Sequence, residues 1–380
     1  MPFLVVRGKG SPGAFPGKLQ LIVGSSFGLL GLLVIRLFIG NFGSLVDAMA
    51  GIHPSFFLLS LLVAGAALFF DSLRLGALLR AVRLPVTPIQ SFRLIMAGTC
   101  LANITPFLFG GAPAQAYLLA RSGYSTGRVG AALVGGGVIA HGLLALGGPV
   151  GMLIGRPGLE RLGFPWEEVM TGVGVYAALV LIITCLGLAW SRSRSATRSR
   201  RETPPRPASA RGLVRRAGIR ESLRREAGEF AGGVREIRAH WAERPSLFWY
   251  TLLYTGLYYA CIFGLGPILL AALTGGKISG EQSVLAAVLF YTGALAAFAV
   301  PTPGGSGGPE AAVLFLGDES FPLGILAALA LLWRFLVFYL PTLFGWFCLA
   351  GLLKSTDTPR GARFSRRSFF SPARRDDAQR

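Results

Sequence analysis

Charged residues are scarce in this chain of 380 residues. Asp, Glu, Lys and Arg make up only 14% of it, whereas 52% of the residues are hydrophobic. The mean hydropathy is +0.57. So few ionisable side chains cannot cover the surface of a soluble protein of this length. The composition therefore excludes an ordinary soluble domain and indicates a polytopic membrane protein.

The sequence also lacks the spacings that hold metals or form catalytic centres. Its four cysteines lie in apolar segments without a CxxC pattern, and its three histidines are scattered. The apolar segments contain no HxxxxD pair, no DxD triplet and no Ser/His arrangement. We therefore predict no catalytic residue, no metal site and no cofactor, and we expect that the protein is not an enzyme.

Acidic residues are few beside the basic ones, and the net charge is +19. The loop 191–245 alone carries fifteen arginines against six acidic residues, and the tail 354–380 is also basic. No aromatic-interleaved module accompanies this charge, so we predict no nucleic-acid partner. Basic loops beside membrane spans are typical of the cytoplasmic side and bind anionic inner-leaflet lipids. Both termini are accordingly predicted to be cytoplasmic, including the N-terminal segment 1–18.

Apolar runs of about 20 residues, long enough to cross a bilayer, predict six full spans. The first is read as an uncleaved span rather than as a signal peptide, because its run exceeds the usual apolar core of a signal peptide. The six runs lie near residues 19–40, 52–73, 129–154, 169–190, 247–273 and 322–353.

Two further apolar segments, 91–123 and 284–317, are interrupted by glycine and proline. If each crossed fully, Arg121, Arg128 and the arginine-rich loop would lie outside, against the positive-inside rule. The stretch 310–316 is also far too short to span as a helix. We predict two re-entrant helical hairpins that enter from opposite faces. The alternative for each break is an ordinary loop at the membrane surface.

The predicted architecture is all-α, with about six full spans, two opposed re-entrant hairpins and a possible inverted repeat. A first membrane half, 19–190, contains the hairpin near 91–123, and a second half, 246–353, contains the hairpin near 284–317. The loop 191–245 between them is expected to be partly disordered and then amphipathic and helical over 213–241. Broken helices at membrane depth need a polar or buried setting and commonly enclose a transport site.

The candidate substrate-binding residues lie at these two breaks and on the last span. Arg334 lies deep in that span and suits a phosphate, with Glu310 or Asp71 as alternative structural partners. Glu310 has two alternative roles: it stabilises the first turn of a helix through the helix dipole, or it binds a cation or a proton. Asp71 and Arg74 form a possible ion pair, structural or functional. The full set is Asn103, Thr105, Pro106, Gly110, Gly111, Gln115, Pro303, Gly304, Gly305, Gly307, Gly308, Glu310 and Arg334.

Several of these positions together resemble the lysylphosphatidylglycerol synthase transmembrane region family, over roughly residues 20–352. The resemblance is to the stand-alone form of this flippase-like membrane domain, because the tail 354–380 is too short for a synthase domain. It implies a multi-pass protein in the cytoplasmic membrane of a prokaryote. It is carried by Asn103-x-x-Pro106, Gly110-Gly111, Leu118-Leu119-x-Arg121, Pro301-x-Pro303-Gly304-Gly305, Glu310, Arg334, Tyr339 and Pro341.

By this resemblance the chain is expected to be a lipid flippase or translocase. A phospholipid or lipid-linked headgroup would move between leaflets through a midplane cavity, and a homo-oligomer is possible. In that reading Arg334 and the amides of 304–308 hold phosphate, while Glu310 and Asn103 contact the polar or cationic part. Two alternatives stay open: an integral membrane enzyme that modifies lipids, and a non-transporting scaffold for envelope lipid biosynthesis.

Overall fold

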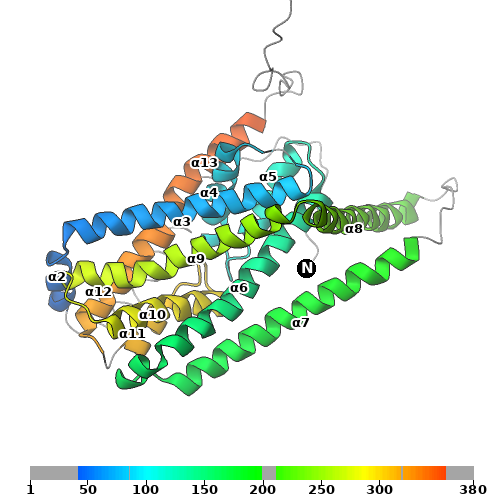
Figure 1. Cartoon of the computed structure of the whole chain (residues 1–380). Coiled ribbons are helices and arrows are strands. Elements are labelled where there is room, and N and C mark those ends of the chain that lie inside the picture. The colour runs from blue at the N-terminus through cyan, green and yellow to red at the C-terminus, as the bar shows by residue number, and fades with distance from the viewer. Residues whose placement is uncertain (1–41, 85, 199–210, 318–319, 357–380) are drawn as a thin grey trace, which may run out of the picture.

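The structure, a computed structural model, describes residues 42–84, 86–198, 211–317 and 320–356 (Figure 1). Apart from one isolated β-bridge, these residues form only helices and their connections. Six helices are long and apolar enough to cross a membrane. The prediction of an all-α polytopic membrane protein is therefore confirmed. The six are Pro54–Ala81, Thr126–Arg161, Trp166–Gly187, Pro245–Leu273, Gly280–Ala299 and Leu323–Leu353.

Five of these six helices coincide with predicted spans, and one does not. The predicted span 19–40 lies outside the described residues. The remaining long helix, Gly280–Ala299, belongs to the second interrupted segment, where the sequence predicted the first arm of a hairpin. Its length alone would let it cross a bilayer, because the interruption comes only after twenty helical residues.

Short connections join consecutive helices, except between α7 and α8, where the twelve residues 199–210 separate them. The last long helix is continuous but contains a π-helical turn, η1, directly after Arg334. The elements are α2 (Phe42–Ala50), α3 (Pro54–Ala81), α4 (Pro88–Asn103), α5 (Gly111–Arg121), α6 (Thr126–Arg161), α7 (Trp166–Arg198), α8 (Arg211–Glu243), α9 (Pro245–Leu273), α10 (Gly280–Ala299), α11 (Gly308–Gly317), α12 (Leu323–Arg334), η1 (Phe335–Tyr339) and α13 (Leu340–Thr356).

The two interrupted segments begin with the same local device. At the start of α4, the Thr87 side chain accepts the Gln90 amide at 3.2 Å, and the Gln90 side chain accepts the Thr87 amide at 2.9 Å. At the start of α10, Ser279 and Gln282 make the same reciprocal pair at 3.1 and 3.0 Å. Such capping boxes satisfy amides that the first helical turn leaves open. Each long helix then ends at a glycine- and proline-rich break, followed by a short helix.

The hairpins α4–α5 and α10–α11 pack in opposite halves of the bundle (Figure 1). The first lies against α3, α13 and the beginning of α6, in a core that includes Leu78, Ile95 and Val129. The second lies against α9, α12 and the later part of α6, in a core that includes Leu269 and Phe290. This placement aims the two breaks toward each other.

The helix expected over 213–241 is α8, which lies against the beginning of α6. The Ser125 hydroxyl donates to the Glu229 carboxylate at 2.5 Å, and Arg128 pairs with Glu236 at 3.4 Å. Close approach is possible because Gly127 and Gly233 face the partner helix without side chains. Upstream, α7 continues as a helix to Arg198, beyond the predicted loop boundary at residue 191.

Candidate functional site

The first break, between α4 and α5, is held by one threonine and is strained at its tip. The Thr105 hydroxyl donates to the Leu101 carbonyl at 2.8 Å and accepts the Gly110 amide at 2.7 Å. Phe107 and Leu108 have φ of 55° and 58°, the left-handed region. This conformation costs an L-residue roughly 1–2 kcal/mol. Two such residues in succession mark a tip that the surrounding structure imposes on the chain.

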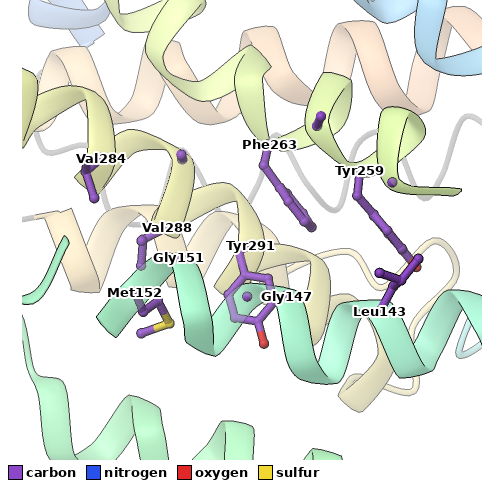
Figure 2. A pocket seen from close by; sticks show the side chains of 13 residues that line it. Leu143, Gly147, Gly151, Met152, Tyr259, Phe263, Val284, Val288 and Tyr291 are labelled. Carbon is purple, nitrogen blue, oxygen red and sulfur yellow. The ribbon is translucent and has the colours of Figure 1, made fainter. Parts of the chain in front are cut away.

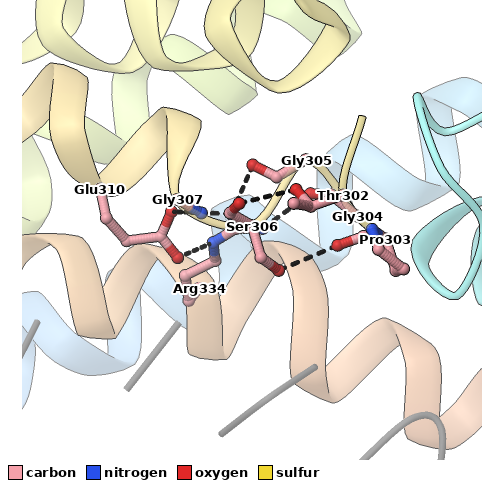
Figure 3. Close-up of polar contacts among 8 residues, drawn as sticks. All are labelled: Thr302, Pro303, Gly304, Gly305, Ser306, Gly307, Glu310 and Arg334. Carbon is pink, nitrogen blue, oxygen red and sulfur yellow. Dashed lines mark hydrogen bonds and ion pairs between the residues drawn. The ribbon is translucent and has the colours of Figure 1, made fainter. Parts of the chain in front are cut away.

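The second break, between α10 and α11, relies on glycine. Gly304, Gly305 and Gly307 all have positive φ, at 61°, 61° and 97°. A Cβ on Gly304 would also overlap the ring of Phe338. The loop closes on itself, because Thr302 donates to the Ser306 carbonyl at 2.6 Å and Ser306 to the Pro303 carbonyl at 2.9 Å (Figure 3).

The two breaks touch. Pro106 and Pro303 form an antiparallel β-bridge. Beside them the Gly304 amide donates to the Thr105 carbonyl at 3.3 Å. Segments almost two hundred residues apart in the sequence therefore meet through their backbones, and the breaks are not loops that lie apart on the surface of the bundle.

Arg334 and Glu310 form a buried ion pair behind the second break. The guanidinium donates to both carboxylate oxygens, from Nε at 2.6 Å and from Nη2 at 2.9 Å (Figure 3). It also donates to the carbonyls of Gly304 at 3.0 Å and Gly305 at 3.2 Å. The exposed fractions of the two side chains are 8% and 1%. A bidentate fork with additional backbone acceptors is the arrangement that a buried charge pair requires.

In this geometry the groups that were predicted to bind phosphate have partners within the protein. All five amides of 304–308 already donate to acceptors within the protein. Four hydrogen bonds also occupy most of the five N–H donors of Arg334. Glu310, the expected ligand for a cationic group, instead accepts from Arg334 and from the Gly307 amide. The structural alternative for Arg334, with Glu310 as its partner, is the one that the structure contains.

Asn103 links the first break to the π-helical turn. Its side-chain amide donates to the Phe338 carbonyl at 3.2 Å and to the Thr342 hydroxyl at 2.8 Å. A π-helical turn displaces carbonyls from the regular helical pattern, and such turns often occur at functional sites. The end of α4 thus satisfies a carbonyl in η1, one turn after Arg334.

A cavity of about 160 Å³ lies beside these contacts. Of the predicted substrate-binding residues, Asn103, Gly304 and Arg334 line it. The other lining residues come mainly from α9, α10 and the last long helix, and they include two adjacent tyrosines that the sequence reasoning did not select. They are Leu108, Leu144, Tyr258, Tyr259, Ile262, Phe263, Ala294, Ala297, Phe298, Pro309, Trp333, Val337 and Phe338.

The remaining predicted site residues build the hairpins and do not line this cavity. Gly110 and Gly111 let α5 approach α4, because a Cβ on Gly110 would overlap the Leu101 carbonyl. The Gln115 side chain lies over Gly98 of α4, so it packs within the hairpin. Thr105 and Pro106, like the 303–308 loop, contribute to the contact between the two breaks. In this structure these residues form contacts within and between the two hairpins.

A second, wider pocket of about 410 Å³ runs between α6, α9 and α10 (Figure 2). Its wall on α6 contains Gly147, Gly148 and Gly151, so the helix backbone itself forms part of the surface. The lining is otherwise apolar, apart from two tyrosines. Tyr259 and Phe263 line both pockets, so the apolar groove and the cavity beside the breaks adjoin at these two side chains.

A second group of polar side chains lies inside the bundle, on α3, α6, α7 and α9. Asp71 and Arg74 are in contact at 2.6 Å between Oδ1 and Nη2, as the sequence suggested. Arg74 lies within electrostatic range of Tyr258, Tyr259 and His141. His141 Nδ1 and the Tyr176 hydroxyl are hydrogen-bonded at 2.7 Å. Besides Asp71 and Arg74, the tyrosine pair in LYYACIF was a signal in the sequence that could have pointed to this group.

Comparison with protein families gives a match over most of the chain. The model of the family described as "Lysylphosphatidylglycerol synthase TM region" matches residues 21–345. No match is found among curated proteins. The matched range includes both interrupted segments, the Asp71–Arg74 pair and Arg334.

Proposed function

The chain belongs to the lysylphosphatidylglycerol synthase transmembrane region family, and from that premise we propose that it moves a phospholipid or a lipid-linked headgroup between leaflets. The observation that carries this proposal is the meeting of two interrupted helical segments beside a partly polar cavity. Broken helices that meet inside a membrane protein commonly form the substrate site of a transporter. The family and the six long apolar helices support a membrane protein concerned with lipid.

The two adjoining pockets suit the two ends of a lipid. A polar headgroup would enter the cavity lined by Asn103 and Tyr258, because these two side chains carry hydrogen-bonding groups. An acyl chain would lie along the apolar, glycine-walled groove between α6 and α10. Such a division lets the headgroup leave water without entering hydrocarbon, where an unpaired polar group costs several kcal/mol. No catalytic step is needed, and we propose a transporter rather than an enzyme.

The basic segments suggest how the protein is oriented. We propose that it lies in the cytoplasmic membrane with α8 and both termini on the cytoplasmic side. The arginine-rich sequence around α8 would then contact anionic lipids of the inner leaflet.

The test is leaflet exchange of a fluorescent phosphatidylglycerol in vesicles that contain the purified full chain. Ala294 lines the cavity on α10, so Ala294→Trp should fill much of it and reduce exchange to the rate of protein-free vesicles. Leu181→Trp is the matched control, because Leu181 lies on α7 with 64% of its surface exposed. This control should exchange lipid as fast as the wild type.

Two outcomes would contradict the proposal. Wild-type vesicles that exchange no lipid faster than empty vesicles would remove the flippase assignment. Equal exchange by Ala294→Trp and wild type would leave transport in place but move its route away from this cavity. In both cases the thermal unfolding of each variant in detergent must match that of the wild type for the comparison to count.

A further inference from the structure

Arg74 and Arg334 both lie inside the bundle, but they differ in how many guanidinium N–H groups are hydrogen-bonded within the protein. Arg334 donates four hydrogen bonds to Glu310 and to two carbonyls. Arg74 touches Asp71, three residues earlier on the same helix, in an ion pair. Arg74 Nε and Asp71 Oδ1 are both buried without a hydrogen-bond partner among the described residues. A buried donor that makes no hydrogen bond costs about 1–3 kcal/mol of stability. Its retention is a reason to look for an acceptor that the protein itself does not supply.

The surroundings of Arg74 favour an anionic acceptor. Tyr258 and Tyr259 lie on α9, which packs against α3, and they interact electrostatically with Arg74. A phenol can donate its O–H. His141 also lies within range, and the imidazole bonds Tyr176. The one acidic side chain that the structure places in this group is Asp71. It neutralises Arg74 when no other anion is present.

The same tyrosines place the group on the proposed lipid route. Tyr258 and Tyr259 line the cavity beside the breaks, and Tyr259 also lines the apolar groove. Arg74 itself lines neither pocket, so an anion held between Arg74 and these tyrosines would reach the cavity through the tyrosine side. A guanidinium recognises phosphate oxygens with two parallel hydrogen bonds, which Arg334 cannot offer while Glu310 holds its fork.

We propose that Arg74, with Tyr258 and Tyr259, binds the phosphate group of the lipid, and that Asp71 is an internal anion competing with it. The proposal rests on the proposed function for its lipid, and it moves the phosphate site from Arg334 to Arg74. Arg334 then serves to hold the second hairpin, and Arg74 serves to hold cargo.

The test measures binding of dioctanoyl phosphatidylglycerol to the purified full chain in detergent. Arg74→Gln should weaken binding about tenfold or more, because it removes a charge-assisted fork. Asp71→Asn should instead tighten binding, because it removes the competing anion. If the pair only joins turns of α3, neither variant should change binding, and that result would overturn the proposal. Arg156→Gln is the matched control, since Arg156 pairs with Glu160 at 2.6 Å on the exposed part of α6.

Folding is controlled by the double variant Asp71→Asn with Arg74→Gln, which leaves no unpaired charge. It should unfold at the wild-type temperature and still bind as weakly as Arg74→Gln; wild-type affinity in this variant would overturn the proposal. A separate measurement tests whether inorganic phosphate binds to the same site and competes with the lipid. If phosphate alone binds as tightly as the lipid and excludes it, the site belongs to free phosphate and the lipid assignment is wrong.

The proposed function and this site fail separately. A wild-type chain that binds the lipid through Arg74 but does not exchange it in vesicles would refute the flippase and retain the site. Exchange that proceeds unchanged in Arg74→Gln would refute the site and retain the flippase.

Discussion

The hairpins α4–α5 and α10–α11 begin alike and are held differently. Both start with a capping box and both break where glycine and proline interrupt an apolar helix. Behind the second break a buried ion pair ties Glu310 and two carbonyls of the loop to Arg334 on the neighbouring helix. Among the described residues, the hydrogen bonds of the first break are neutral: Thr105 bonds within the hairpin, Asn103 donates to η1 and α13, and the Thr105 carbonyl accepts the Gly304 amide.

The difference indicates which hairpin can move. The Arg334 side chain is 8% exposed and the Glu310 side chain 1%. Separating the two would leave an unpaired charge in an apolar interior. Neutral hydrogen bonds contribute about 1 kcal/mol each, so the first break can detach at far lower cost. Its two left-handed residues, Phe107 and Leu108, store strain that detachment would release. We therefore expect the second hairpin to be the fixed side of the cavity and the first to be its moving side.

The largest effect is expected from Glu310→Ala, which removes the anchor of the second hairpin. It leaves Arg334 buried and unpaired, and such a change costs about 3–5 kcal/mol of unfolding free energy. The measurement is a dodecyl sulfate titration in mixed micelles. Asp71→Ala on α3 is the comparison, because its pair with Arg74 is more exposed, at 13% and 18%. Equal losses for the two variants would show that the anchor is not exceptional.

Gly304→Ala should come next, because it separates the two breaks where they touch. The added methyl group would meet the Phe338 ring, and the position has a φ of 61°. We expect a loss of about 1–3 kcal/mol in the same titration. Gly142→Ala on α6 is the matched control, since a Cβ there meets nothing within 4 Å. A neutral result at Gly304 would mean that the contact between the breaks contributes little to stability.

Asn103→Ala tests the weaker attachment of the first hairpin. It removes the donor to the Phe338 carbonyl and to the Thr342 hydroxyl, and it should cost about 1–2 kcal/mol. The expected signature is local: hydrogen exchange at amides of α4 and α5 should accelerate, while exchange in α10 and α11 stays unchanged. Acceleration in both hairpins to the same degree would contradict the assignment of a moving and a fixed side.

The sequence predicts the helices and the two breaks better than it predicts which residues form the site, and the reason is physical. Apolar run length and glycine or proline position are local properties, so they located five long helices and both breaks. The partner of Arg334 depends on which helices pack together, and sequence left Glu310 and Asp71 as alternatives. Tyr258 and Tyr259 lie in a helix that is apolar on every face, so nothing local separates a cavity-lining tyrosine from one that faces lipid.

The smallest expected effects come from the two capping boxes, where the hairpins are alike. Thr87→Ala and Ser279→Ala each remove one side-chain acceptor from the first turn of a helix. Each should cost about 1 kcal/mol, and the two costs should agree because the geometry is the same. If the hairpins differ only at their breaks, the titration gives equal values. A much larger cost for Ser279→Ala would place part of the second hairpin's rigidity at its beginning, and the ion pair alone would then not explain which side of the cavity is fixed.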